Sequence, residues 1–158
     1  MTIISVFFKS VVSFLLLFAV SFSAHAGKGP TYVDRKGIAI AGYDTVSYFV
    51  ENKPVKGNKK FQYEWNGGIW RFSNAKNLEA FKKSPEKYAP QYGGYCAYAV
   101  ANRSYARIDP TVYTVLNDKL YLNYNARVKK RWSKKRSSFI DQADGYWPQL
   151  LEEQKEEG

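Results

Sequence analysis

The chain has very few of the residues that most often carry chemistry. Its 158 residues include one histidine, His25, one methionine, Met1, and one cysteine, Cys96. A single cysteine cannot form an internal disulfide. Because His25 lies in a segment with the features of a leader, no Ser-His or Cys-His catalytic pair is expected in the rest of the chain, and most soft-metal sites are excluded. Function must therefore use tyrosine, tryptophan, carboxylates, cations, backbone groups and at most one thiol.

Residues 1–26 have the features of a secretory signal. Lys9 precedes an apolar run at residues 11–22, and residues 24–26 read Ala-His-Ala, a small-x-small cleavage pattern. The apolar run is shorter than the roughly 18–20 residues that a membrane-spanning helix needs. We therefore predict cleavage near Ala26 and a mature protein that is periplasmic or secreted.

The rest of the chain has the size of one ordinary domain. Neither repeats nor low-complexity stretches divide it. The predicted organisation is a cleavable signal at residues 1–26, a mobile segment at 27–37, one domain with a C-terminal extension at 38–151, and an acidic tail at 152–158.

Two segments have the alternation and the turn residues of β-hairpins. The first joins residues 61–65 to 69–72 through Asn66-Gly67, and the second joins residues 112–116 to 119–124 through Asn117-Asp118.

Helical patterns lie between and after these hairpins. Ser73 is the expected N-cap of one helix, and Asn125 is the expected N-cap of a later basic helix. Pro148 predicts a break or kink in the last helical pattern. Two β-hairpins interleaved with short helices, followed by C-terminal helices, predict a small single-domain α+β fold.

The chain is basic, with a formal net charge of +10, and the charge is concentrated. The segment from Arg127 to Arg136 holds seven cations in ten residues. Such a run is typical of a solvated helix face, and it also allows contact with an anionic envelope surface. We expect no nucleic-acid partner for an exported protein.

Aromatic residues after the first hairpin follow the spacing of a known family. Phe72, Phe81, Pro85 and Tyr88 read F-x8-F-x3-P-x2-Y, which resembles the YHS domain, a small metal-associated module. Residues 42–49 are similar to its opening segment, which reads Asp-Pro-Val-Cys-Gly-Met in metal-binding members. Three further sequence segments resemble the C-terminal extension of an exported YHS subgroup: residues 91–100, 108–110 and 119–124.

The sequence departs from the resemblance at the metal ligands. The positions of the family cysteines hold Ser47, Ser73 and Asn77, and the family histidine has no counterpart. Affinity for soft metals depends on polarisable thiolates, which serine and neutral asparagine do not supply. The resemblance therefore implies the fold, while the family metal site is not expected.

Cys96 follows Gly93-Gly94-Tyr95 and has two interpretations. In the first turn of a helix, its thiol would be activated by free N–H groups, as a redox or thiol-transfer enzyme requires. The alternative is a small buried core side chain, which is common for cysteine.

Tyrosines are the second group of candidates. Tyr92, Tyr95 and Tyr98 recur at three-residue spacing, which would place them on one helix face. Together with Tyr43 and Tyr48, they could line a pocket for a planar ligand, and tyrosine with Asp44 or Asp109 could hold a hard cation. The alternative is aromatic core packing.

The sequence thus favours a non-enzymatic binding module for a small planar ligand or a metal ion. Its predicted site comprises Tyr43, Asp44, Tyr48, Tyr92, Tyr95, Cys96 and Tyr98. Two alternatives stay open: a thiol-dependent redox enzyme that uses Cys96, and an envelope interaction protein that uses the basic helix at residues 127–136.

Overall fold

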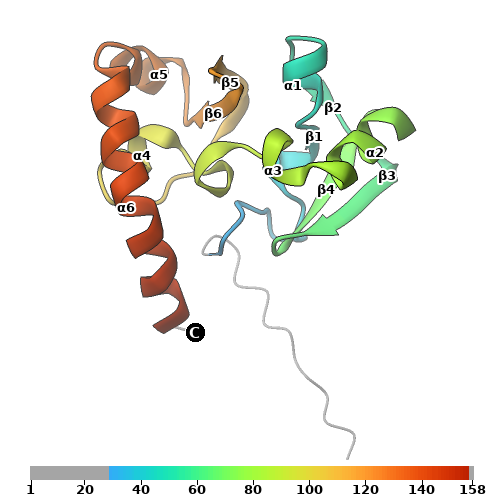
Figure 1. Cartoon of the computed structure of the whole chain (residues 1–158), viewed down its shortest axis with the longest axis horizontal. Coiled ribbons are helices and arrows are strands. Elements are labelled where there is room, and N and C mark those ends of the chain that lie inside the picture. The colour runs from blue at the N-terminus through green and yellow to red at the C-terminus, as the bar shows by residue number, and fades with distance from the viewer. Residues whose placement is uncertain (1–28, 157–158) are drawn as a thin grey trace, which may run out of the picture.

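The computed structural model describes residues 29–156, so the predicted leader lies outside the described residues. The chain first forms small strands and helices that pack together (Figure 1). In order, these are η1 (Ile40–Gly42), β1 (Tyr43–Asp44), α1 (Ser47–Val50), β2 (Val55–Lys56), β3 (Asn58–Trp65), β4 (Gly68–Phe72), α2 (Ala75–Lys83) and α3 (Pro85–Tyr88).

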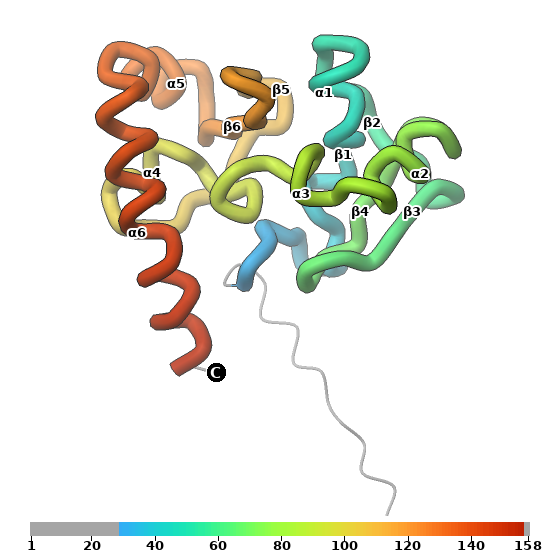
Figure 2. The backbone as a smooth tube through the Cα atoms, viewed as in Figure 1, coloured from blue at the N-terminus to red at the C-terminus, as the bar shows by residue number. Residues whose placement is uncertain are grey.

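The second part of the chain adds a hairpin and most of the helical residues. Its elements are η2 (Gln91–Gly94), α4 (Ala97–Ala101), β5 (Asp109–Leu116), β6 (Lys119–Asn123), α5 (Ala126–Ser133) and α6 (Arg136–Glu156). The long helix α6 forms one side of the molecule and packs on α4 (Figures 1 and 2). Within residues 29–156, no helix is long and apolar enough to cross a membrane.

Both predicted hairpins are confirmed, and the fold is α+β as predicted. β3 pairs with β4 and β5 with β6, each antiparallel, and the turns fall at Asn66-Gly67 and Asn117-Asp118. All four turn residues have positive φ, the conformation that tight hairpin turns require. A third antiparallel pair, β1 with β2, was not predicted.

Helix boundaries differ from the prediction at two points. Asn74, not Ser73, caps α2 by accepting a hydrogen bond from the backbone N–H of Asn77. The prediction of Ser73 as the cap was wrong because its hydroxyl is hydrogen-bonded elsewhere. The predicted break at Pro148 does not occur, and α6 continues through it into the acidic tail. Ala143 and Leu150 are buried on either side of this proline, so packing favours the continuous helix. The predicted cap at Asn125 is confirmed.

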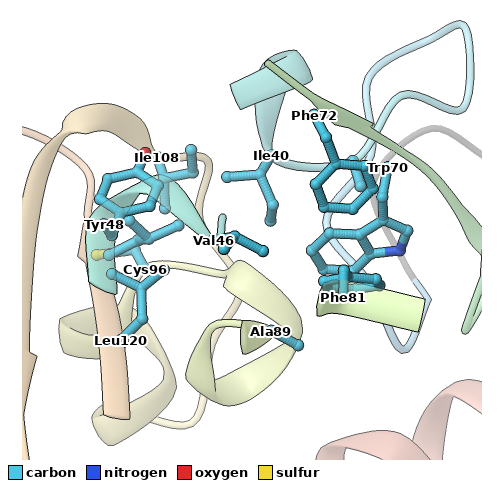
Figure 3. Packing of buried hydrophobic residues seen from close by; sticks show 12 residues of the cluster. Ile40, Val46, Tyr48, Trp70, Phe72, Phe81, Ala89, Cys96, Ile108 and Leu120 are labelled. Atoms are coloured by element: carbon cyan, nitrogen blue, oxygen red, sulfur yellow. The ribbon is translucent and has the colours of Figure 1, made fainter. Parts of the chain in front are cut away.

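The core contains two packed groups of side chains. In the first, Trp70, Phe72 and Phe81 lie together beneath the first hairpin, and the group extends through Val46 toward the second hairpin at Leu120 (Figure 3). Phe81 lies 4.9 Å from Phe72 and 5.0 Å from Trp70 between ring centroids. The second group lies beneath α6 and includes Tyr92, Tyr95, Val100, Tyr121 and Trp132.

A left-handed turn at residues 92–94 joins the two parts of the molecule. Tyr92, Gly93 and Gly94 have φ values of 57°, 59° and 85°. The Gly93 carbonyl accepts a hydrogen bond of 2.8 Å from the backbone N–H of Tyr32. A Cβ at residue 93 would lie 2.0 Å from the Pro30 carbonyl oxygen. Pro30 and Tyr32, which lie in the segment predicted to be mobile, therefore contact this turn.

The turn provides a test of the fold through two glycine substitutions. We expect Gly93→Ala to lower the free energy of unfolding by at least about 2 kcal/mol, because a left-handed alanine and a backbone clash combine. Gly145→Ala is the matched control, because a Cβ at that position in α6 meets nothing within 4 Å. It should raise stability by about 0.5–1 kcal/mol. Urea unfolding of both variants checks this; equal stabilities would contradict the structure of the turn.

Candidate functional site

The carboxylate of Asp44 lies at the centre of a buried hydrogen-bond cluster, and the residue is 0% exposed. Oδ1 accepts hydrogen bonds from the backbone N–H groups of Val46 and Ser47, at 3.0 and 3.3 Å. Oδ2 accepts three more: from the Ser73 N–H at 2.8 Å, the Ser73 hydroxyl at 2.6 Å and the Asn77 side-chain amide at 2.7 Å. This carboxylate therefore connects β1, the start of α1, the end of β4 and helix α2.

Two of the three positions expected to hold cysteine in metal-binding relatives meet at this carboxylate. Ser73 and Asn77 both reach Oδ2, and the Asn77 amide also lies 3.4 Å from the Ser73 hydroxyl. The third position holds Ser47, whose hydroxyl lies 2.7 Å from the Asp44 carbonyl and 3.0 Å from the Lys53 carbonyl as donor, and it accepts from the Val55 N–H. Ser47 contributes only its backbone N–H to the carboxylate.

The Asp44 cluster does not fit a metal ion. A carboxylate offers about four lone-pair positions, and the five donors around Asp44 already occupy them. The neighbouring groups are hydrogen-bond donors, whereas a cation needs acceptors. Within residues 29–156, no group of three His, Cys, Asp or Glu side chains is placed to hold a metal. The cluster is a structural connection.

The predicted tyrosines do not form one pocket. Tyr48 belongs to the first core group, where its hydroxyl donates to the Pro110 carbonyl at 2.7 Å. Tyr43 lies at the surface of the first part, with the Lys56 ammonium 4.3 Å from its ring centroid. Tyr92 and Tyr95 belong to the second core group. These residues therefore divide between the two parts of the molecule.

The expected helix face at residues 92–98 is wrong. The left-handed turn at residues 92–94 interrupts the periodicity, and α4 begins only at Ala97. Tyr95 packs against Tyr105 and Trp147, whereas Tyr98 packs against Phe139 on α6. Only Tyr98 of the three lies in α4.

Burial raises the pKa of three of these tyrosines: Tyr48, Tyr92 and Tyr95. It raises the pKa of Tyr48 well above its ordinary value, and burial with the hydrogen bond to Asp144 does the same for the pKa of Tyr92. Burial also raises the pKa of Tyr95 to about 12. A cation would be ligated most strongly by the charged phenolate, which is the form that burial disfavours.

Cys96 lies in the core beside Tyr48 and Leu120, and it is 1% exposed (Figure 3). It precedes the five-residue helix α4, and its backbone N–H donates to the Ala106 carbonyl. Its sulfur accepts a long hydrogen bond from the Asn123 side-chain amide, at 3.9 Å. Of the two interpretations of Cys96, the structure matches the buried core side chain.

Sequence reasoning missed a hollow between the two parts of the molecule. Its volume is about 380 Å³, and its aromatic lining comes from Trp65 at the end of β3, Tyr92 of η2 and Trp147 of α6. Charged side chains also line it: Glu86, Lys119 and Asp144. Tyr92 is the one predicted site residue in this lining. Its hydroxyl donates to Asp144 Oδ1 at 2.8 Å, which fixes both side chains.

The arrangement of β1–β4 and α1–α3 around Asp44 defines a small α+β domain with two aromatic strands above a helix. A scan against protein-family models matches residues 46–92 to the YHS domain. The chain therefore contains a YHS domain, which ends where the left-handed turn begins. Searches of curated proteins and of solved structures found no match to the chain.

The Asp44 cluster can be tested by replacing the carboxylate with an amide. In Asp44→Asn, an NH₂ group faces the Ser73 backbone N–H, which cannot rotate away, so a buried donor loses its acceptor. We expect the free energy of unfolding to fall by about 2–3 kcal/mol, measured by urea denaturation.

Asp34→Asn is the control for this substitution. Asp34 is exposed and accepts from the N–H groups of Lys36 and Ile38 through one oxygen, which asparagine retains. Its stability should change by less than about 0.5 kcal/mol. If Asp44→Asn were as mild as this control, the cluster would not be a main connection in the domain.

The burial of Cys96 predicts its reactivity. We expect iodoacetamide to modify it only after unfolding in urea, as read by intact-mass spectrometry, because thiol reactivity requires access. Ser138→Cys is the control, since residue 138 is exposed on α6 and its thiol should react in the native state. Rapid native labelling of Cys96 would restore the thiol-enzyme alternative.

Proposed function

We propose that the protein is a binding module for a small planar ligand, which lies in the hollow between the YHS domain and α6. The observation that carries this proposal is the meeting of Trp65, Tyr92 and Trp147 around one hollow. Ligand sites favour concave places between structural units. The lining of this hollow combines aromatic rings with charged side chains. In this proposal the hollow is the ligand-binding site, in place of the pocket lined by five tyrosines that the sequence predicted.

The size and rings of the hollow limit what it can hold. A volume of about 380 Å³ is near the lower end of the range for ligand pockets, roughly 300–1,000 Å³, so the ligand is small. The Tyr92 and Trp147 rings lie 6.3 Å apart between centroids and are inclined at 68°. The two rings thus contact each other edge to face beside the hollow, and aromatic walls of this kind bind flat molecules through stacking and edge contacts.

The charges of the lining favour a positively charged ligand. Glu86 and Asp144 supply two carboxylates against the single cation of Lys119. No ion pair within residues 29–156 joins these three side chains to one another, and Asp144 Oδ1 accepts the Tyr92 hydroxyl. Aromatic rings add attraction for a cation through their π faces. We therefore propose a planar organic cation as the ligand class, and we propose that the protein binds it after export.

The proposal is tested with proflavine, a planar aromatic cation, by fluorescence anisotropy. Wild-type protein should bind it saturably at one site, and anilinonaphthalene sulfonate, a planar anion, should bind more weakly. Trp147→Ala should weaken proflavine binding at least tenfold, because it removes one aromatic wall. Glu86→Gln removes one exposed charge, is not expected to disturb the core, and should weaken binding about threefold.

Tyr124→Ala is the matched control, because Tyr124 is an exposed aromatic residue outside the hollow. It should bind proflavine as wild type does. Equal binding by Trp147→Ala, Glu86→Gln and this control would overturn the proposal. Native mass spectrometry and elemental analysis of protein from its native source form the second arm: a stoichiometric metal and no organic ligand would also overturn it.

A further inference from the structure

Five exposed cations form a stripe along one side of α5 and the turn that follows it. This basic ridge consists of Arg127, Lys130, Arg131, Lys134 and Lys135, all exposed. The spacing of i, i+3 and i+4 places Arg127, Lys130 and Arg131 on one face of α5, and Lys134 and Lys135 follow directly after its last residue, Ser133. The three cations on the helix extend over about 6 Å, at 1.5 Å of rise per helical residue.

The opposite side of α5 is fixed to the domain. Trp132 is fully buried, and its ring lies 5.5 Å from Tyr121 of β6. Lys129 points to the same side, where its ammonium donates to the Tyr113 carbonyl of β5. Arg136 lies over the Trp132 ring, 5.4 Å from its centroid. The seven cations of the segment therefore divide into two that pack against the domain and five that face outward.

The basic ridge has no acidic neighbour to neutralise it. The sequence contains no aspartate or glutamate between Asp118 and Asp141. The ion pairs within residues 29–156 all lie elsewhere; they join Lys53 to Glu51, Lys82 to Glu79, Arg103 to Glu153 and Lys155 to Glu152. Attraction to the helix C-terminus explains cations in the last turn of α5, such as Lys130 and Arg131. It does not explain Arg127 in the first turn, where the dipole disfavours a cation.

We propose that the basic ridge is an electrostatic docking surface for the anionic headgroups of a lipid bilayer. The cations stand on a convex helix, so they suit a flat, extended surface. They lack exposed apolar neighbours for insertion, since Trp132 is buried, so contact stays at the headgroups and is reversed by salt.

A single-stranded nucleic acid fits less well, because it needs aromatic rings on which bases can stack. The exposed ring nearest in sequence, Tyr124, is covered by the Arg107 guanidinium at 5.1 Å. A duplex remains as the competing partner in the experiment.

Vesicle cosedimentation of the full chain tests the proposal. At 100 mM NaCl, the protein should bind vesicles of phosphatidylcholine with 30% phosphatidylglycerol and should not bind pure phosphatidylcholine. Each cation near such a surface contributes about fivefold to partitioning. In the quintuple variant R127Q/K130Q/R131Q/K134Q/K135Q, the partition coefficient for the anionic vesicles should therefore fall at least 100-fold. Its circular dichroism spectrum and its affinity for proflavine should stay unchanged.

The matched control removes five exposed lysines from the other part of the molecule: K59Q/K60Q/K76Q/K83Q/K87Q. It has the same net charge as the ridge variant and should retain most of the binding. Equal losses in the two variants would overturn the proposal, because total charge and not the ridge would then be responsible. Tighter binding to a 20-base-pair DNA duplex than to the vesicles, at equal phosphate concentration and salt, would overturn it in favour of a nucleic-acid surface.

Discussion

The YHS domain of this chain depends on one buried negative charge and the donors that surround it. Asp44 has no cation paired with it within residues 29–156, so its carboxylate is satisfied by hydrogen bonds alone. A buried charge is tolerated only when it is fully hydrogen-bonded. This requirement fixes the position of Ser73 at the end of β4 and of Asn77 in α2. The aromatic core between these elements then has a defined geometry.

The same constraint shows what the family's cysteine positions do in this chain. Ser73 and Asn77, which stand at two of the family's cysteine positions, both serve Asp44, because each supplies a hydrogen-bond donor to Oδ2. They join segments that are distant in sequence through one charged group.

The parts of the fold that could be predicted are those with local signals. Asn66-Gly67 and Asn117-Asp118 specify tight turns between alternating strands, and Asn125 specifies a helix start through its own side chain. The pairing of β1 with β2 has no such signal, because two strands of two residues each have no periodicity. Ser73 illustrates the limit of local reasoning. Serine is a good helix cap, but the Ser73 hydroxyl donates to the distant Asp44 carboxylate instead.

The candidate site shows the same limit more strongly. The three-residue spacing of Tyr92, Tyr95 and Tyr98 indicated a helix face, although Gly93-Gly94 within it was a visible signal for a left-handed turn. The hollow could not be predicted, because Trp65 and Trp147 are brought together only by the packing of α6 against the rest of the chain. The sequence analysis selected Tyr92 for its spacing, whereas in the structure its hydroxyl donates a hydrogen bond to Asp144.

These features distinguish the YHS domain from the hollow beside it. In the domain, hydrogen bonds to the Asp44 carboxylate hold β1, the start of α1, the end of β4 and α2 together. At the hollow, Tyr92 donates to Asp144 and Tyr105 donates to the Leu150 carbonyl, so hydrogen bonds join these side chains to α6. Trp65, Tyr92 and Trp147 come from three elements and line one space there. This hollow lies outside the family's cysteine positions, and it is the place where we propose that the ligand binds.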